Sequence, residues 1–228
     1  MVGSIAALPG SAVAGTSGGW SFLGKGAAAG SAAIADKVDV VERSGTELHV
    51  GGQFVNAGGI AAADRIAVWN GSAWSAVGAG IGNGTVFAIA VDPVTRDVYA
   101  GGSFSDAGSD LHADGIARWD GSHWSSLDSV SLNANVTALE VVGRALDVGG
   151  AFSNAAGLAP ADAIAAWDLD GGGWSAITDS DLAVGGTVSD IEADGAGHFW
   201  ARAPMARTAP RRTFGTSPPS AAGCTSAG

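Results

Sequence analysis

Three ungapped segments of the chain repeat one another, and this repetition constrains the fold more than any other feature. Each segment begins with a glycine doublet and ends with a tryptophan; the doublets start at Gly51, Gly101 and Gly149, in steps of 50 and 48 residues. A second tryptophan follows each segment, and two short apolar runs joined by a polar turn precede it. A unit of this length, with four short strands and no helical pattern, has the size and content of one β-propeller blade.

The sequence therefore predicts an all-β chain, a β-propeller built from four-stranded antiparallel blades of 48–50 residues. In the middle unit, strands are expected at 86–91, 98–103, 115–119 and 123–127. Within a propeller segment covering 1–200, three complete blades are expected at about 38–78, 86–128 and 136–178, and half blades at 5–24 and 188–201.

The residues that recur are interpreted as structural. We expect the tryptophans to pack between blades or across hairpins, the glycine doublets to allow close strand packing near the ring axis, and the aspartate to accept hydrogen bonds from the backbone of the long loop. The alternative for the tryptophans is exposure as platforms that stack on sugars. The recurring positions are Gly51, Gly52, Phe54, Asp64, Trp69 and Trp74; Gly101, Gly102, Phe104, Asp114, Trp119 and Trp124; and Gly149, Gly150, Phe152, Asp162, Trp167 and Trp174.

The outer hairpin of each blade has a predicted register. Asn70-Gly71 and Asp120-Gly121 separate the last two strands, and both dipeptides tolerate the positive φ of a two-residue type I′ turn. Such a turn places Ala67 opposite Trp74, so that the two tryptophans of a blade lie diagonal to each other on one face.

The strings LHVGG, VYAGG and LDVGG, followed by paired aromatic residues, resemble the kelch class of propeller repeat. Kelch repeats carry a Tyr and then a Trp after the doublet, whereas this chain uses Trp twice. The longer string G-G-x-F, A-D-x-I-A-x-W, D/N-G-S-x-W is similar to kelch-like repeats of large exported bacterial proteins and of fungal cortical cell-polarity marker proteins. The resemblance covers about residues 38–193 and implies the fold, with the matching positions in structural roles.

The ends leave two architectures open. The two half blades could combine and close a four-bladed ring, or the chain could be part of a larger propeller whose open blade edges self-associate. Residues 202–228 are rich in Arg and Pro and contain no Asp or Glu, and this abrupt change favours the second architecture. The segment is expected to be either a disordered tail or the product of a reading-frame shift.

Charge and composition exclude several classes of partner. The chain carries 22 acidic and 11 basic side chains, a formal net charge of -11. Nucleic-acid grooves and anionic membrane surfaces reward clustered Lys and Arg, so neither partner is expected. No apolar run approaches the roughly 20 residues that a membrane helix needs. Cys224 is the only cysteine, which excludes a disulfide scaffold and a thiolate metal cage.

No catalytic constellation can be assigned. The four histidines fall at unrelated positions of the repeat, and no Ser-His-Asp set or metal-ligand spacing is present, so we expect neither an enzyme nor a resident metal or cofactor. A candidate binding loop contains Asp106, Asp110 and His112. The carboxylates of this loop, together with Asp114, make calcium the one cofactor to consider.

The expected function is that of a non-enzymatic binding or structural module, a segment of an exported repeat propeller that presents loops to a protein or glycan partner. Its non-repeated residues, such as Asp110, His112 and Arg118, are the expected contacts. The alternatives are a carbohydrate-binding propeller and an accessory domain of a secreted hydrolase or oxidase. The parent protein is expected to be extracellular or at the cell surface, although residues 1–16 make a poor signal peptide.

Overall fold

In the part of the chain that the structure describes, the strands form four separate antiparallel sheets, three of them four-stranded. The structure, a computed structural model, describes residues 33–129, 131–159, 161–177, 186–193, 198–202 and 214–215. Blade 1 comprises β1 (Val38–Ser44), β2 (Glu47–Gly52), β3 (Ile66–Trp69) and β4 (Trp74–Ala76). Blade 2 comprises β5 (Val86–Val91), β6 (Val98–Gly102), β7 (Ile116–Trp119) and β8 (Trp124–Ser125). Blade 3 comprises β9 (Val136–Val142), β10 (Ala145–Gly150), β11 (Ile164–Asp168) and β12 (Trp174–Ala176).

A last sheet of three strands follows the blades: β13 (Asp190–Ala193), β14 (His198–Arg202) and β15 (Phe214–Gly215). Within every sheet the strands lie side by side in chain order, and each strand is antiparallel to its neighbour. The prediction of an all-β chain built from four-stranded antiparallel blades is confirmed. The half blade expected at 5–24 lies outside the described residues.

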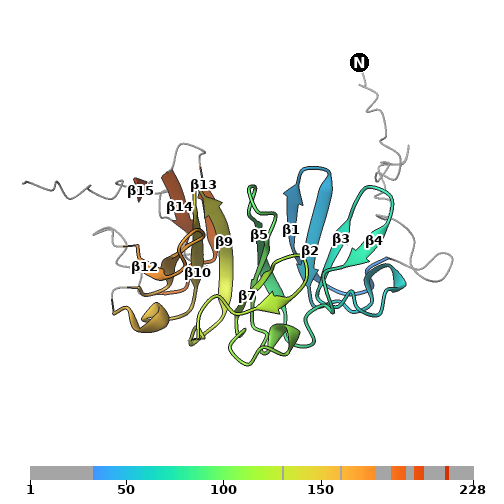
Figure 1. Ribbon diagram of the computed structural model, residues 1–228, viewed down its shortest axis with the longest axis horizontal. Coiled ribbons are helices and arrows are strands. Elements are labelled where there is room, and N and C mark those ends of the chain that lie inside the picture. Colours follow the sequence, from blue (N-terminus) through green and yellow to red (C-terminus); the bar gives the residue numbers. More distant parts are fainter. Residues whose placement is uncertain are drawn as a thin grey trace, which may run out of the picture.

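The blades stack face to face in chain order. The innermost strands pack next to one another, β1 beside β5, β5 beside β9 and β9 beside β13. Figure 1 shows the sheets as a row that runs from blade 1, in blue and teal, to the last sheet, in orange. The first strands of successive sheets thus lie next to one another, as they do in consecutive blades of a propeller.

Each blade has two apolar faces because side chains alternate along a strand. In blade 2, Ala100 and Ala117 belong to the core that contains Ile66 and Val68 of blade 1. The opposite face of blade 2 contributes Tyr99 to the core shared with blade 3. Hydrophobic burial between neighbouring sheets therefore holds the stack together.

The glycine doublets sit where sheets approach most closely. A methyl group on the first glycine of each doublet would strike a valine that begins the first strand of the next sheet or lies just before it. A methyl group on the second glycine would overlap the carbonyl oxygen just before the first strand of its own blade. The distances from that methyl carbon to valine Cγ1 are 2.6 Å for Gly51 and Val86, 2.6 Å for Gly101 and Val136, and 2.5 Å for Gly149 and Val188. Only glycine fits at this spacing.

The paired tryptophans face each other directly across the outer hairpin, which corrects the predicted register. Trp69 pairs with Trp74 and Ala67 with Ala76, and blade 2 repeats the pairing with Trp119 and Trp124. The ring centroids lie 5.4 Å apart in blade 1, 5.7 Å in blade 2 and 5.4 Å in blade 3. Contacts of this kind add about 0.5–1.5 kcal/mol each beyond area burial.

The turn chemistry explains the error. Asn70 does not adopt positive φ, as a type I′ turn requires, whereas Gly71 does, at 97°. Instead, the Asn70 side-chain oxygen accepts backbone hydrogen bonds from Ser72 at 3.0 Å and Ala73 at 2.9 Å. This Asx-type turn encloses four residues rather than two, so the tryptophans become direct partners.

The last sheet keeps the register of a blade. Ile191 pairs with Ala201 as Ile89 pairs with Ala100. Phe214 pairs with Phe199 and therefore occupies the strand position that Trp119 holds in blade 2. Phe214 and Gly215 belong to the segment for which the sequence predicted a disordered or frame-shifted tail, and in the structure they pair as the third strand of this sheet.

Candidate functional site

Long loops connect the second and third strands of each blade, and they gather along one edge of the stack. Each contains a short 3₁₀ turn: η1 (Ala57–Gly59), η2 (Ala107–Ser109) and η3 (Ala155–Gly157). Figure 1 shows these turns along the lower edge of the molecule. We call this edge, formed by residues 53–65, 103–115, 151–159 and 161–163, the loop edge.

The three loops share one backbone scaffold. In blade 2, Ala107 N donates to Ala113 O at 3.2 Å and Gly115 N donates to Phe104 O at 2.9 Å. Ala107 and Ala113 are fully buried and Phe104 nearly so, and their counterparts in blades 1 and 3 are buried as well. The loops are therefore fixed frames rather than free segments.

The recurring aspartate closes this frame. Its Oδ1 accepts a hydrogen bond from the backbone N–H of the residue eight positions earlier in each blade, as the sequence predicted for this residue type. The bonds run from Asn56 to Asp64 at 2.8 Å, from Asp106 to Asp114 at 3.0 Å and from Asn154 to Asp162 at 2.8 Å. The donors Asn56, Asp106 and Asn154 all adopt left-handed conformations, which Asn and Asp tolerate best after glycine.

Two asparagines tie the loop edge to the preceding blade. Asn83, in the segment after blade 1, accepts a hydrogen bond from Ser105 N at 2.9 Å and donates to Ser105 O at 3.0 Å. Asn133 makes the same pair of bonds with Ser153, at 3.0 Å each. These bonds hold neighbouring loops at a fixed spacing.

The tips of the loops differ where everything around them repeats. Residues 60–62 read Ile-Ala-Ala, residues 110–112 read Asp-Leu-His, and residues 158–160 read Leu-Ala-Pro. Identical frames thus present different side chains along one edge, which is how repeat folds build a recognition surface.

The tip of blade 2 is the most distinctive. Asp110 Oδ2 accepts hydrogen bonds from Ser126 N at 2.8 Å and Ser126 Oγ at 2.9 Å, and its Oδ1 accepts one from His112 N at 3.0 Å. The backbone hydrogen bonds from Ser126 and His112 lower the pKa of Asp110. This carboxylate is therefore ionised at neutral pH and anchors the tip.

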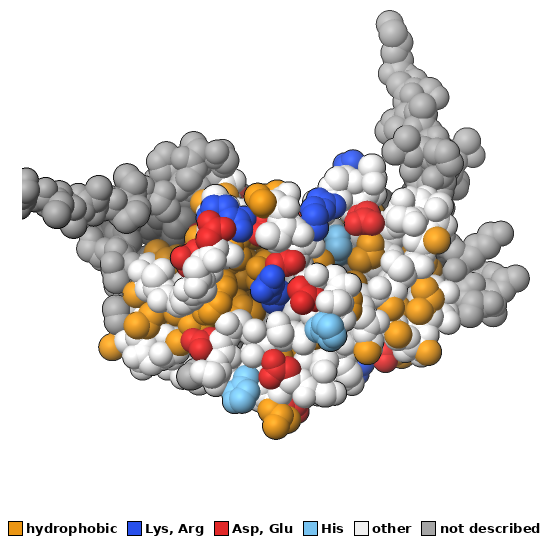
Figure 2. Space-filling model, viewed as in Figure 1, with side chains coloured by type: hydrophobic (Ala, Val, Ile, Leu, Met, Phe, Trp, Pro, Cys, Tyr) orange, Lys and Arg blue, Asp and Glu red, His pale blue; other side chains and the backbone are white. Residues whose placement is uncertain are grey.

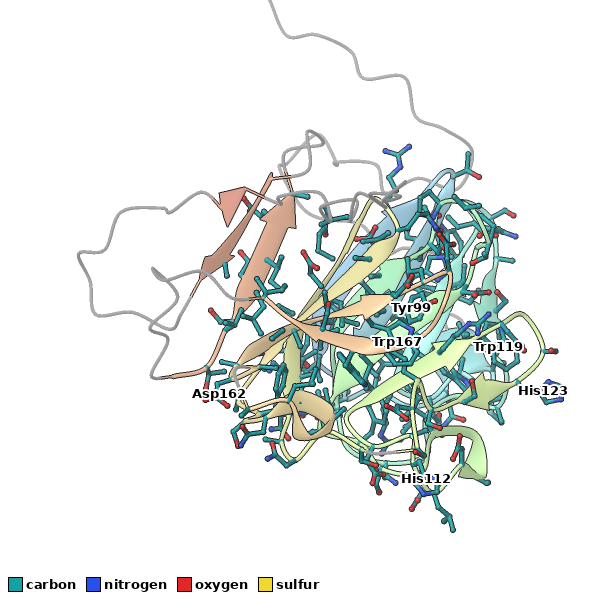
Figure 3. All side chains as sticks on the ribbon, turned by 60° about the vertical axis from the view of Figure 1, so that its left-hand side comes forward. Tyr99, His112, Trp119, His123, Asp162 and Trp167 are labelled. Atoms are coloured by element: carbon teal, nitrogen blue, oxygen red, sulfur yellow. The ribbon has the colours of Figure 1, made fainter. Side chains whose placement is uncertain are left out.

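Leu111 and His112 project from this anchored tip. Leu111 is 75% exposed, the most exposed large hydrophobic side chain in the described part of the chain. The His112 side chain is 57% exposed, with its Nδ1 3.8 Å from Asp110 Oδ1. Figure 3 places His112 at the lower periphery, and Figure 2 shows a histidine and a hydrophobic side chain protruding at the lowest point of the molecule. An exposed leucine on a rigid tip is a candidate anchor for a partner.

The calcium hypothesis finds no preformed ligand set in the described residues. Asp110 points its oxygens at Ser126 and His112, Asp114 Oδ1 accepts the bond from Asp106 N, and Asp114 Oδ2 lies 3.3 Å from Ser131 Oγ. Among the residues that the structure describes, no three His, Cys, Asp or Glu side chains are grouped so that they could hold a metal ion.

Arg118 does not belong to the loop edge, contrary to the expectation that grouped it with Asp110 and His112. It lies in β7, and its Nε and Nη2 each lie 2.7 Å from Asp97 Oδ2, in the turn that precedes β6. That turn is at the opposite end of the strands from the loops. Arg118 therefore pairs within its own blade.

The tryptophans form packing contacts rather than open platforms. Trp69, Trp74 and Trp124 are buried, and Trp119, Trp167 and Trp174 are partly buried against the cores between blades. Figure 3 shows Trp119 and Trp167 among the sheets. Of the six tryptophans with described side chains, none is exposed in the way that stacking on a sugar requires.

An inter-blade ion pair escaped sequence reasoning because it does not repeat. Arg144 Nη1, between β9 and β10, lies 2.9 Å and 3.0 Å from the two carboxylate oxygens of Asp92, which follows β5 in blade 2. Burial alone would raise the pKa of Asp92, but hydrogen bonds from Arg144, Val94 and Thr95 outweigh it and lower the pKa to about 2. The pair is a structural clamp between blades 2 and 3.

Two carboxyl groups lie between blade 3 and the last sheet. Asp147 is 3% exposed and is the direct cross-strand partner of Glu140. Burial raises the pKa of Asp147 to about 7, and burial together with the nearby charges of Glu42, Asp147, Asp190 and Glu192 raises that of Glu140 to about 7. When both carboxyl groups ionise, their mutual repulsion and their burial destabilise the contact between blade 3 and the last sheet.

Comparison with solved structures finds distant structural likenesses. No protein-family model and no curated protein matches the chain. Among solved structures, the chain is similar to the extracellular domain of a hybrid two-component system from B. thetaiotaomicron, with a TM-score of 0.48 and 12% sequence identity. The match covers 73% of this chain and 20% of that one, so the chain spans about a fifth of its length.

The described residues contain no helix long and apolar enough to cross a membrane. This agrees with the interruption of every apolar run in the sequence by Gly, Ser or a charged residue.

Proposed function

We propose that this chain is a non-enzymatic binding module, a segment of an exported kelch-like propeller that presents its loop edge to a protein partner. The observation that carries the proposal is the contrast within each loop. The frame residues are buried and bonded alike in all three blades, whereas the tips at 60–62, 110–112 and 158–160 carry different side chains. A frame that is held constant while its tips vary is suited to recognition.

The chemistry of the blade 2 tip favours a protein over a glycan. Leu111 offers an exposed apolar anchor, while His112 and Asp110 beside it offer a donor and an acceptor. An apolar anchor surrounded by polar groups is typical of protein contacts. A glycan site would instead need an exposed aromatic face, and the described tryptophans are packed.

The kelch-like identity and the extracellular location belong to the same proposal. The kelch-like identity is supported by the G-G-x-F and A-D-x-I-A-x-W strings, whose residues occupy the packing positions that a propeller repeat requires. The extracellular location follows from the resemblance of these strings to repeats of exported bacterial proteins. Whether the chain closes with its own half blades or forms part of a larger ring, the loop edge of blades 1 to 3 is the same.

A pair of matched variants tests the proposal. Leu111→Asp alters the loop edge, and Val94→Asp makes the same kind of change at the opposite edge, where Val94 is 70% exposed. The immobilised wild-type chain and both variants are exposed to the extracellular proteins of the source organism, and captured proteins are quantified and then re-assayed in purified form. We expect a partner whose affinity falls at least about tenfold with Leu111→Asp and is unchanged with Val94→Asp. Equal binding by all three chains would refute the proposal.

A further inference from the structure

Two Asn-Gly dipeptides occur in the described part of the chain, and the hydrogen bonds of their asparagine side chains differ. Asn70-Gly71 lies in the turn between β3 and β4, and Asn83-Gly84 lies in the segment between blades 1 and 2. Asparagine before glycine is chemically labile because the glycine nitrogen, unhindered by a neighbouring Cβ, can attack the side-chain amide carbon. The surroundings of each amide decide which of the two reacts in the folded protein.

The turn at Asn70 collects hydrogen-bond donors on one atom. Asn70 Oδ1 accepts bonds from Ser72 N at 3.0 Å, Ser72 Oγ at 2.9 Å and Ala73 N at 2.9 Å. When a nucleophile adds to the amide carbon, negative charge develops on this oxygen. Preformed donors aimed at such an oxygen stabilise the charge, as in an oxyanion hole.

The other reacting groups at this turn are free. Among the described residues, neither Asn70 Nδ2, which must leave, nor Gly71 N, which must attack, has a hydrogen-bond partner. Asn70 is exposed, and a methyl group on Gly71 would find nothing within 4 Å. The turn therefore has room for a ring to form.

Asn83 is held at both ends of its amide. Its Nδ2 donates to Ser105 O at 3.0 Å and Ser105 Oγ at 3.3 Å, and its Oδ1 accepts from Ser105 N at 2.9 Å. The following Gly84 is packed against the Phe104 backbone, which a methyl group there would meet at 2.7 Å. Reaction at Asn83 would have to break bonds that tie blade 1 to the loop of blade 2.

We propose that Asn70 is a site of self-catalysed deamidation in the folded protein. The Gly71 nitrogen forms a bond to Asn70 Cγ and gives up its proton, the Cγ–Nδ2 bond breaks, and ammonia leaves with that proton. Water then adds to the resulting succinimide and opens either carbonyl–nitrogen bond. The product is an aspartyl or an isoaspartyl residue, and no reactant other than water is needed.

The fold already contains the aspartyl product at the equivalent turn of blade 2. Asp120 Oδ1 accepts hydrogen bonds from Ser122 N, Ser122 Oγ and His123 N, each at 2.8 Å. Deamidation of Asn70 to aspartate therefore adds one negative charge and keeps the turn. The isoaspartyl product inserts an extra carbon into the main chain and disturbs the pairing of Trp69 with Trp74.

Peptide mass spectrometry of the full chain, aged at neutral pH with and without urea, tests this proposal. In urea the contexts Asn-Gly-Ser and Asn-Gly-Thr are nearly equivalent, and we expect the two asparagines to convert at similar rates. In the folded chain we expect Asn70 to convert about tenfold or more faster than Asn83, because Asn83 must first lose its bonds to Ser105. A ratio of rates that is the same with and without urea would overturn the proposal.

Two variants separate the role of the turn from a general effect of exposure. Ser72→Ala removes one donor to Asn70 Oδ1, and we expect it to slow conversion at Asn70 in the folded chain relative to its rate in urea. Asn70→Asp mimics the product and is expected to melt at the same temperature as the parent chain. An unchanged folded-state rate in Ser72→Ala, or a collapsed hairpin in Asn70→Asp, would count against the proposal.

Discussion

Trp124 Nε1 donates a hydrogen bond of 3.1 Å to the backbone carbonyl of Val77, 47 positions earlier, and so links blade 2 to blade 1. The corresponding nitrogen of Trp174 in blade 3 is buried and has no partner among the described residues. The indole N–H of this repeated tryptophan is therefore hydrogen-bonded in blade 2 and has no described partner in blade 3.

This difference predicts unequal effects of one substitution. Trp124→Phe removes the donor, while the Val77 carbonyl keeps its hydrogen bond from Gly80 N at 3.0 Å. We therefore expect a loss of about 0.5–1.5 kcal/mol of unfolding free energy from the bond in addition to lost packing. Trp174→Phe removes a donor that has no partner, and its cost should be smaller. Urea unfolding of both variants makes the comparison, and an equal or larger loss in Trp174→Phe would contradict it.

The spacing of the sheets predicts that the glycine doublet cannot be enlarged. Gly101→Ala would place a methyl group 2.6 Å from Val136 Cγ1, and we expect it to cost at least about 1–3 kcal/mol. Gly82→Ala is the control, because Gly82 does not have positive φ and a methyl group there meets nothing within 4 Å. Thermal unfolding should show a clear loss for the first and little change for the second; similar melting temperatures would mean that the sheets do not pack this closely.

The buried carboxyl pair predicts a stability that falls as pH rises. The pKa values of Asp147 and Glu140, about 7 in the folded chain, lie above their unfolded values, so their contribution is fully present below about pH 4 and is lost as pH rises to 7. Asp147→Asn should flatten this part of the profile, measured by urea unfolding across the pH range. A profile that is unchanged by Asp147→Asn would argue against a buried acid at this interface.

Asp92 predicts the opposite dependence at lower pH. Its pKa of about 2 lies below the unfolded value, so its stabilising contribution is present above about pH 4 and is lost as pH falls towards 2. Arg144→Gln should reduce this contribution by breaking the clamp to Asp92, while the bonds from Val94 and Thr95 remain. The pH range over which Asp92 changes stability does not overlap the range for Asp147 and Glu140. One series of unfolding experiments across pH therefore measures both effects.

A strained alanine predicts a stabilising substitution. Ala156 has φ of 49°, where blades 1 and 2 have Gly58 and Gly108 at the same position of the loop. Ala156→Gly relieves the left-handed strain, and we expect a gain of about 1 kcal/mol. Thermal unfolding measures the gain, and a loss of stability would mean that the Ala156 methyl group packs favourably.

The sequence predicts the repeated part of this structure well because each repeated residue acts within its own blade or against the neighbouring one. The glycine doublet, the Asp64-type loop bond and the paired tryptophans are all used three times. The hairpin register was wrong because the Asn70 side chain competes for the backbone of the turn, a role that the Asn-Gly-Ser string itself could have indicated.

The remaining features could not be predicted because they are not repeated. The bond between Arg144 and Asp92 joins residues 52 positions apart, and only the stacking of blades brings them together. The exposure of Leu111 likewise depends on which loop residues the frame turns outward. Both are properties of the assembled stack rather than of a single repeat.

Amide hydrogen exchange of the chain with and without its captured partner tests the central claim most directly, since it locates the contact without altering a residue. The account predicts slower exchange in 103–115, centred on the tip at 110–112, and no change in the turn at 92–97 on the opposite edge. Protection of 92–97 with none in the loops would contradict it.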